Sequence, residues 1–204
     1  MVAETPPATP ERIRGLADVA NNLAWSWHRE ARALFRSIDE NLWHLYRHNP
    51  ADLLRNIDPA RLIALAADPL FLERYDAVMR WLAAETSFDE TWFSRTHPDL
   101  RGKTIAYFCA EFGVHSSVPI YSGGLGVLAG DHCKEAADLG VPLIGVGFMY
   151  PQGYFHQHIS AEGWQEESYE RLNWEDAPIE RALALHAPDL KVRGARARDA
   201  KMPR

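Results

Sequence analysis

Residues 105–149 read IAYFCAEFGVHSSVPIYSGGLGVLAGDHCKEAADLGVPLIGVGFM, and this stretch decides the fold. Two short apolar runs, at residues 104–109 and 142–149, flank a segment whose apolar residues share one helical face over residues 126–139. Gly140 supplies a stop signal for that helix. Strand, loop, helix and strand in this order predict a βαβ unit, so we expect a parallel sheet covered by helices.

The loop between the first strand and the helix ends in a glycine cluster. Gly123, Gly124 and Gly126, together with Leu125, lie where the loop becomes the helix. In an open α/β sheet ligands bind beyond the carboxyl ends of the strands, and glycines let backbone N–H groups approach an anion at a helix N-terminus. The segment is therefore a candidate phosphate cradle, although it has neither the P-loop nor the dinucleotide pattern. The alternative is a tight turn that requires positive φ.

Four polar residues around the glycine cluster are candidates for the shell of the site. Glu111 follows the first strand and is expected to bond a sugar hydroxyl or to orient the glycine loop, the alternative being a surface salt bridge. Tyr121 directly precedes the loop and is a candidate to pack on a ligand. Asp131 and His132 lie in the first turns of the helix, where an aspartate also suits the helix dipole, so a structural role is equally open for them.

Other reactive side chains carry weaker signals. Residues Tyr154–Ile159 predict a further strand, on which His156 and His158 share one face with Tyr154. No third ligand is evident nearby, so no metal site is predicted. Cys109 and Cys133 are expected to be buried thiols, since no histidine or asparagine pattern makes either a nucleophile.

The first 85 residues predict helices. Apolar residues recur at helical spacing over 16–38, which indicates one amphipathic helix or two nearly collinear ones. A capping residue followed by proline predicts helix starts near residues 10, 50, 59 and 69. Four tryptophans in this part suggest either an aromatic core, which we favour, or a sugar-stacking platform; they are Trp25, Trp27, Trp43 and Trp81. Residues 86–100 are expected to form a partly packed linker.

Composition and charge exclude several classes of protein. The chain has 204 residues, 47% of them hydrophobic, with a formal net charge of -6 and only two cysteines. It has no apolar stretch long enough to span a membrane and no signal-peptide pattern, so a cytoplasmic protein that binds no nucleic acid is expected. Residues 181–204 carry seven basic and two acidic residues and show no helix or strand period over 191–204. This basic tail suggests a truncated or frame-shifted reading frame, the alternative being an arm that binds phosphate or nucleic acid.

The series AEF, YSGGLGVLAGDH, GVGFMYPQGYF and GWQ resembles the N-terminal part of the α-glucan phosphorylases, the glycogen and maltodextrin phosphorylases, in their shorter bacterial type. LADVANNLAWSWHREARALFRSIDENLWHLYRHNPADLLRNI resembles the helical domain that precedes their catalytic body. The resemblance covers residues 12–180. It implies a two-lobed GT-B-type glycosyltransferase fold and reversible phosphorolysis of α-1,4-glucan to glucose 1-phosphate. It also implies pyridoxal 5′-phosphate as cofactor, bordered by the backbone amides of residues 123–126.

The resemblance divides the chain into a helical N-terminal domain at 1–100, the start of a catalytic lobe at 101–180, and the basic tail at 181–204. The lysine that binds the cofactor belongs to a later segment of the family, and neither Lys103 nor Lys134 lies in its motif. We therefore expect no catalytic residue in this chain and an inactive fragment. The expected partners are α-1,4-glucan and inorganic phosphate, with homo-oligomerisation of the full-length enzyme left open.

Two other functions remain as alternatives. One is a non-catalytic glucan-binding or regulatory module. The other is a glycosyltransferase similar to glycogen synthase, which would need a basic residue just before the glycine pair. Tyr121 and Ser122 stand at that place instead, which counts against it.

Overall fold

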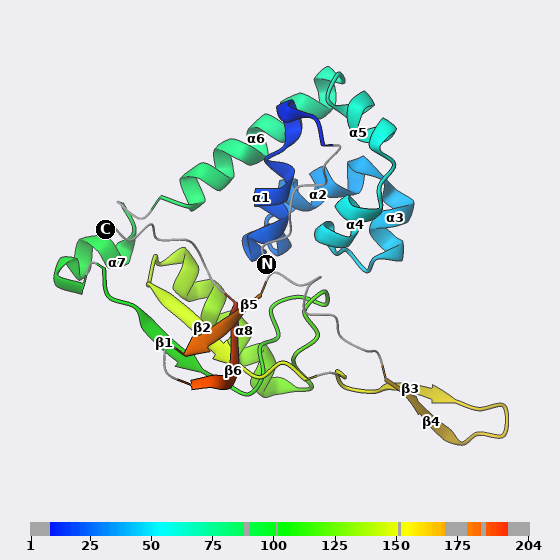
Figure 1. Ribbon diagram of the computed structural model, residues 1–204, viewed down its shortest axis with the longest axis vertical. Coiled ribbons are helices and arrows are strands. Elements are labelled where there is room, and N and C mark those ends of the chain that lie inside the picture. The colour runs from blue at the N-terminus through cyan, green and yellow to red at the C-terminus, as the bar shows by residue number, and fades with distance from the viewer. Residues whose placement is uncertain are drawn as a thin grey trace.

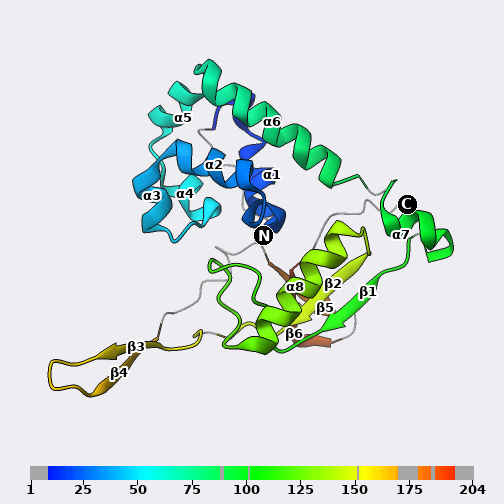
Figure 2. The ribbon, with the colours of Figure 1, turned by 180° about the vertical axis from the view of Figure 1, so that it is seen from behind.

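The computed structural model describes residues 9–87, 90–100, 102–150, 152–169, 179–184 and 187–195. Helices dominate the N-terminal half, and a βαβ unit with a small sheet follows (Figure 1). A two-stranded hairpin projects away from both, as the reverse view also shows (Figure 2). The molecule is thus a mixed α/β structure whose helical part is concentrated at the N-terminus.

The helices of the described residues begin and end as follows: α1 Leu16–Asn21, α2 Arg29–Ile38, α3 Glu40–Leu45, α4 Pro50–Asn56, α5 Pro59–Leu65, α6 Pro69–Glu85, α7 Trp92–Thr96 and α8 Gly124–Asp138. Three short 3-10 turns accompany them: η1 Glu11–Ile13, η2 Leu23–Ser26 and η3 Pro98–Leu100. In the described part of the chain, no helix is long and apolar enough to cross a membrane.

Three of the four predicted proline starts are confirmed. The side chains of Asn49, Asp58 and Asp68 each accept a hydrogen bond from a backbone N–H in the first turn of α4, α5 and α6. The start near residue 10 is different, because η1 is a single 3-10 turn with no side-chain cap. The hydroxyl of Thr9 is buried there without a hydrogen-bond partner.

Residues 16–38, predicted as one amphipathic helix or two nearly collinear ones, do not form a single helix, because the chain breaks into α1, η2 and α2. The Asn22 side chain accepts the N–H of Ala24 and the His28 ring accepts the N–H of Ala31. Each of these bonds caps a new helical segment and ends the preceding one, since a local side chain competes for backbone donors. The apolar residues still face one core, which explains why their period runs through both breaks.

The helical region has an aromatic core. Trp25 lies edge-on to Phe35 and Trp43, with ring centroids 6.3 and 5.9 Å apart, and all three side chains are buried. Because the three rings are buried, none of them presents an open face on which a sugar could stack. The preference for an aromatic core over a sugar-stacking platform is thus confirmed for Trp25 and Trp43, whereas Trp27 is 36% exposed.

The predicted βαβ unit is confirmed. Strand β1 (Ile105–Phe108) pairs in parallel with β2 (Leu143–Gly147), and α8 connects them. Gly140 ends the helix with φ 73°, the left-handed conformation that a glycine stop supplies.

Part of the basic tail forms a strand, although residues 191–204 show no strand period in the sequence. Strand β6 (Ala187–Ala195) pairs antiparallel with the free edge of β2 and with β5 (Glu180–Ala184), which gives the order β1-β2-β6-β5. The pairing is a backbone ladder, which does not depend on a period of side chains. Residues 196–204 lie outside the described part.

The predicted strand at Tyr154–Ile159 forms only from His156. Strands β3 (His156–Ile159) and β4 (Gln165–Ser168) pair antiparallel and form a separate two-stranded sheet. Every side chain of the two strands is exposed.

The predicted linker is packed against the end of α8. The N–H of Phe93 in α7 donates to the carbonyl of Leu139 over 3.0 Å. Phe93 is buried, and Thr91 lies against Gly140, where a Cβ would come within 2.3 Å of the threonine side chain. The helical region is therefore joined to the βαβ unit by close contacts.

Candidate functional site

The backbone of the glycine loop is extended at the residue that precedes α8. Gly123 has φ -154° and ψ -156° and precedes the first helical residue, Gly124. The described glycines with positive φ are Gly102, Gly140 and Gly163, so the alternative of a left-handed tight turn in the glycine cluster is wrong. A Cβ built on Gly123 or Gly124 would meet no atom within 4 Å. The backbone at the helix start therefore borders open space.

Glu111 lies directly against this helix start. Its carboxylate accepts the Ser122 hydroxyl at 2.5 Å, the Ser122 N–H at 3.2 Å and the Gly123 N–H at 3.4 Å. The Ser122 hydroxyl and these N–H groups, with that of Gly126, hold the pKa of Glu111 below its usual range. An ionised carboxylate thus stabilises the N-terminus of α8.

Two backbone N–H groups in the first turn of α8 are available as hydrogen-bond donors. Gly124 and Leu125 lie in the first turn of α8, where no intrahelical acceptor exists. Among the described residues no hydrogen bond is recorded for either N–H, and the space in front of Gly124 is open. These two donors can take an anionic oxygen beside the Glu111 carboxylate.

Three other glycines hold the loop close to the helix, and the sequence reasoning missed two of them. The Gly113 N–H donates to the Gly126 carbonyl over 2.7 Å. A Cβ on Gly130 would lie 2.2 Å from the Gly113 carbonyl oxygen, and one on Gly126 would lie 2.4 Å from the Cβ of Tyr121. The four-residue spacing of Gly126 and Gly130 puts both on one helix face, and it was the available signal for this close approach.

The structure brings Glu111 and Tyr121 to the glycine loop but not the other two candidates. Tyr121 packs on Gly126 through its Cβ, and its side chain is partly exposed. Asp131 is exposed and lies 3.9 Å from the Lys134 ammonium on the same helix. The His132 ring contacts Tyr107 of β1, with centroids 4.9 Å apart.

The histidines and cysteines outside the loop form no recorded metal site. Within the described ranges, no group of three or more histidine, cysteine, aspartate or glutamate side chains is placed to hold a metal ion. His158 Nε2 lies 3.0 Å from the Ser168 hydroxyl across the hairpin. Burial raises the pKa of the Cys133 thiol to about 11, so Cys133 is a poor nucleophile at neutral pH.

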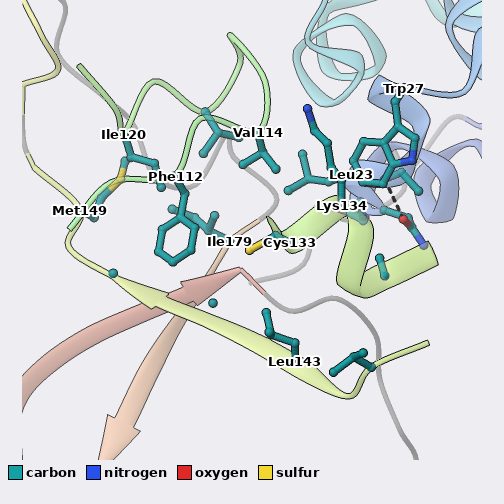
Figure 3. A pocket seen from close by; sticks show the side chains of 18 of the residues that line it. Leu23, Trp27, Phe112, Val114, Ile120, Cys133, Lys134, Leu143, Met149 and Ile179 are labelled. Atoms are coloured by element: carbon teal, nitrogen blue, oxygen red, sulfur yellow. Dashed lines mark hydrogen bonds between the residues drawn. The ribbon is translucent and has the colours of Figure 1, made fainter. Parts of the chain in front are cut away.

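An apolar pocket lies elsewhere, between the helical region and the βαβ unit. Its walls include Leu23 and Trp27 from η2 and its C-terminal flank, Phe112 from the loop, and Cys133 and Lys134 from α8 (Figure 3). Neither Glu111 nor the glycine cluster lines it. The pocket and the glycine loop are therefore separate features along one helix.

Comparison with known proteins adds two findings. The model of a family described as "Protein of unknown function (DUF3417)" matches residues 9–118. Curated relatives match further: maltodextrin phosphorylase of Thermococcus litoralis at 43% identity and glycogen phosphorylase of Mycobacterium tuberculosis at 43%, each over 83% of this chain and 20% of the relative. Glycogen phosphorylase of Aquifex aeolicus is 42% identical over 89% of this chain and 25% of its own length.

The chain therefore spans about a fifth to a quarter of the length of these relatives. No solved structure matches it.

Proposed function

The chain belongs to the family described as a protein of unknown function, DUF3417, and from this premise we propose that it forms part of an α-glucan phosphorylase. Such an enzyme converts glycogen or maltodextrin and inorganic phosphate to glucose 1-phosphate. The observation that carries the proposal is the 43% identity over 83% of the chain to relatives named maltodextrin and glycogen phosphorylase. That similarity is long enough to include both the helical region and the glycine loop.

The part that this chain would play is to hold phosphate charge at the start of α8. The free amides of Gly124 and Leu125 and the open space before Gly124 fit a phosphate oxygen. They would border the phosphate of pyridoxal 5′-phosphate or of the substrate. The cofactor phosphate would supply the proton transfer, as the family resemblance implies.

Glu111 has a defined task in this proposal. Its carboxylate accepts hydrogen bonds from Ser122 and Gly123 and so orients both residues. The backbone of the loop is therefore fixed before an anion binds. Because the amides of Gly124 and Leu125 are then already oriented, binding an anion costs little free energy of reorganisation. The ionised carboxylate repels any other anion, so we expect the phosphate on the Gly124 side of the turn, away from Glu111.

The coarser features of the chain fit this assignment. We propose that residues 1–100 form the helical domain, that 101–180 begin the first lobe of a GT-B-type fold, and that Tyr121, Asp131 and His132 lie in the shell of the substrate site. The parallel β1–β2 pair covered by α8 supports the second point. We further propose a cytoplasmic enzyme.

The experiment that tests the function is a chimera. Residues 12–169 of this chain replace the matching segment of the Mycobacterium tuberculosis glycogen phosphorylase, and glucose 1-phosphate release from maltodextrin is measured with phosphate and pyridoxal 5′-phosphate. We expect activity within about tenfold of the parent. The Gly124→Val change, which fills the open space before the free amides, should lower kcat at least about tenfold.

Leu128→Val, one turn further along the exposed side of α8, is the matched control and should leave kcat unchanged. A folded chimera that binds the cofactor but releases no glucose 1-phosphate would contradict the assignment. Retained binding of maltooligosaccharide by the isolated chain without turnover in the chimera would instead support a glucan-binding module.

A further inference from the structure

The apolar pocket between the helical region and the βαβ unit has a defined size and two unlike ends. Its volume is about 110 Å³. Phe112, Ile120 and Met149 lie at one end, and Trp27 and Lys134 lie at the other (Figure 3). An engineered apolar cavity of about 150 Å³ stays dry and binds benzene. The size of the pocket thus limits an enclosed ligand to about one ring.

The Phe112 ring forms a restrained wall of the pocket. It lies against β2, where a Cβ on Gly145 would come within 3.2 Å of the ring and one on Gly147 within 3.0 Å. Tyr107 of β1 stands edge-on to it, with ring centroids 5.8 Å apart and ring planes at 89°. Because β2 and Tyr107 hold the buried ring in place, Phe112 does not swing inward and close the pocket.

Two sulfur atoms favour an aromatic ligand. The side chains of Cys133 and Met149 line the pocket together with Phe112 (Figure 3). Burial raises the pKa of the Cys133 thiol to about 11, so the thiol is uncharged at neutral pH and behaves as a small apolar group. Sulfur atoms and the edges of other rings make favourable contacts with an aromatic ring. These walls therefore suit a flat aromatic ring better than an aliphatic group of the same size.

The polar part of the lining favours an uncharged ligand. Glu85 of α6 and Lys134 of α8 carry opposite charges, and Asn21 and Asn22 add neutral amides. The Lys134 ammonium lies 5.6 Å from the centroid of the Trp27 ring. A ligand of either charge would meet a like charge in this part of the lining, which costs free energy. A hydroxyl group avoids that cost and still forms hydrogen bonds there.

The pocket and the glycine loop share one segment of the chain. The Phe112 N–H donates to the Ile120 carbonyl over 3.2 Å, and the two residues form an antiparallel bridge. Glu111 directly precedes Phe112, and its carboxylate accepts the hydroxyl and the N–H of Ser122 just beyond Ile120. A ligand that packs on Phe112 and Ile120 therefore restrains both arms of the loop that Glu111 holds.

We propose that this pocket binds an uncharged ligand with one aromatic ring, and that the bound ligand stabilises the glycine loop. The ring lies among Phe112, Cys133 and Met149, and a polar substituent faces the end that contains Trp27. Because the ligand contacts both Phe112 and Ile120, the hydrogen bond between them opens less often. This site goes beyond the proposed function and does not depend on the phosphorylase assignment.

The test is titration of the 204-residue chain with benzyl alcohol, followed by NMR of the backbone amides. Cyclohexylmethanol, which has the same carbon skeleton without the aromatic ring, is titrated in parallel. We expect saturable binding of benzyl alcohol with a Kd on the order of 1 mM, and binding of cyclohexylmethanol at least about fivefold weaker. With benzyl alcohol at about ten times its Kd, hydrogen exchange of the Phe112 N–H should slow about tenfold, because opening then requires release of the ligand.

Ala137→Leu fills the pocket from α8 and should weaken binding at least about tenfold. The matched control is Ala64→Leu, the same change at an exposed position of α5 outside the lining, which should leave the Kd unchanged. Circular dichroism establishes that both variants fold. Nuclear Overhauser effects from the ring protons of benzyl alcohol to the Met149 methyl group locate the ligand in the unaltered chain, so this part of the test needs no variant.

Three results would overturn the binding site: no saturable binding of benzyl alcohol, equal affinity for cyclohexylmethanol, or no contact between the bound ring and Met149. Equal Kd values for folded Ala137→Leu and Ala64→Leu would also overturn it. Binding that leaves the exchange of the Phe112 N–H unchanged would overturn the effect on the loop.

Discussion

At the scale of single residues, Glu111 and His115, which lie between β1 and α8, both have lowered pKa values. Glu111 accepts hydrogen bonds from three donors at the helix start, and His115 lies on the same loop, where burial is the main cause that lowers its pKa to about 4. The sequence indicated that Glu111 lies beyond a strand end and is able to orient the glycine loop. The position of His115 left no such sign, because its ring contacts Trp25, which is far away in the sequence and meets it only when the helical region packs on the loop.

His115 makes stability depend on pH. Its pKa is lowered in the folded state, so the stabilisation is present above the unfolded pKa of about 6.5 and is lost as the pH falls toward 4. We expect the free energy of unfolding to fall by about 1 kcal/mol over that range, after allowance for partial exposure. Urea unfolding at pH 7 and pH 4.5 measures it.

His115→Gln should flatten the part of that pH dependence that the wild-type chain shows between pH 6.5 and 4. His44→Gln, on the exposed side of α3, is the control and should leave the slope in place. An unchanged slope in the His115 variant would assign the effect to other groups.

Glu111 should control the exposure of the loop amides. Glu111→Gln removes the negative charge that the Ser122 and Gly123 amides face, so both amides should exchange with solvent about tenfold faster. Hydrogen exchange followed by NMR at pH 7 measures this. In the wild-type chain the same acceleration should appear only as the pH falls through the lowered pKa of Glu111. Equal protection in the variant would show that the carboxylate does not hold the loop.

At the scale of elements, local rules predict where helices start better than where they stop. Asn49, Asp58 and Asp68 each precede proline, and their caps form as predicted. The positions of the breaks at Asn22 and His28 were missed because a continuous apolar period hides two local caps. The β6 pairing was missed because β6 lies between β2 and β5 and pairs with both, and no pattern in residues 187–195 indicates that pairing.

The packing of α8 on its loop gives a direct test. Gly130→Ala would place a Cβ 2.2 Å from the Gly113 carbonyl oxygen, and backbone on both sides prevents an easy shift. We expect a loss of about 2–3 kcal/mol in the free energy of unfolding. Gly124→Ala, on the same helix with no atom within 4 Å, should cost almost nothing. Thermal unfolding of the two variants gives the comparison, and equal losses would contradict the close approach of α8 to Gly113.

At the scale of the whole molecule, α7 fastens the helical region to the βαβ unit. Gly140→Ala combines a positive φ with a Cβ 2.3 Å from Thr91, so we expect it to destabilise by about 3 kcal/mol and to expose the segment near residue 90 to proteolysis. Gly102→Ala has a similar φ but open space, so it should cost about 1 kcal/mol. Limited proteolysis and thermal unfolding separate the two, and identical behaviour would show that strain alone matters.

The hairpin formed by β3 and β4 is a sheet of its own, separate from the four-stranded sheet. Among the described residues its strands pair only with each other, its side chains are exposed, and it projects from the body of the molecule (Figure 1). Its turn at residues 161–163 is therefore a suitable attachment point for a fluorophore or an affinity tag. A label placed there would report on the orientation of the chain without disturbing the glycine loop.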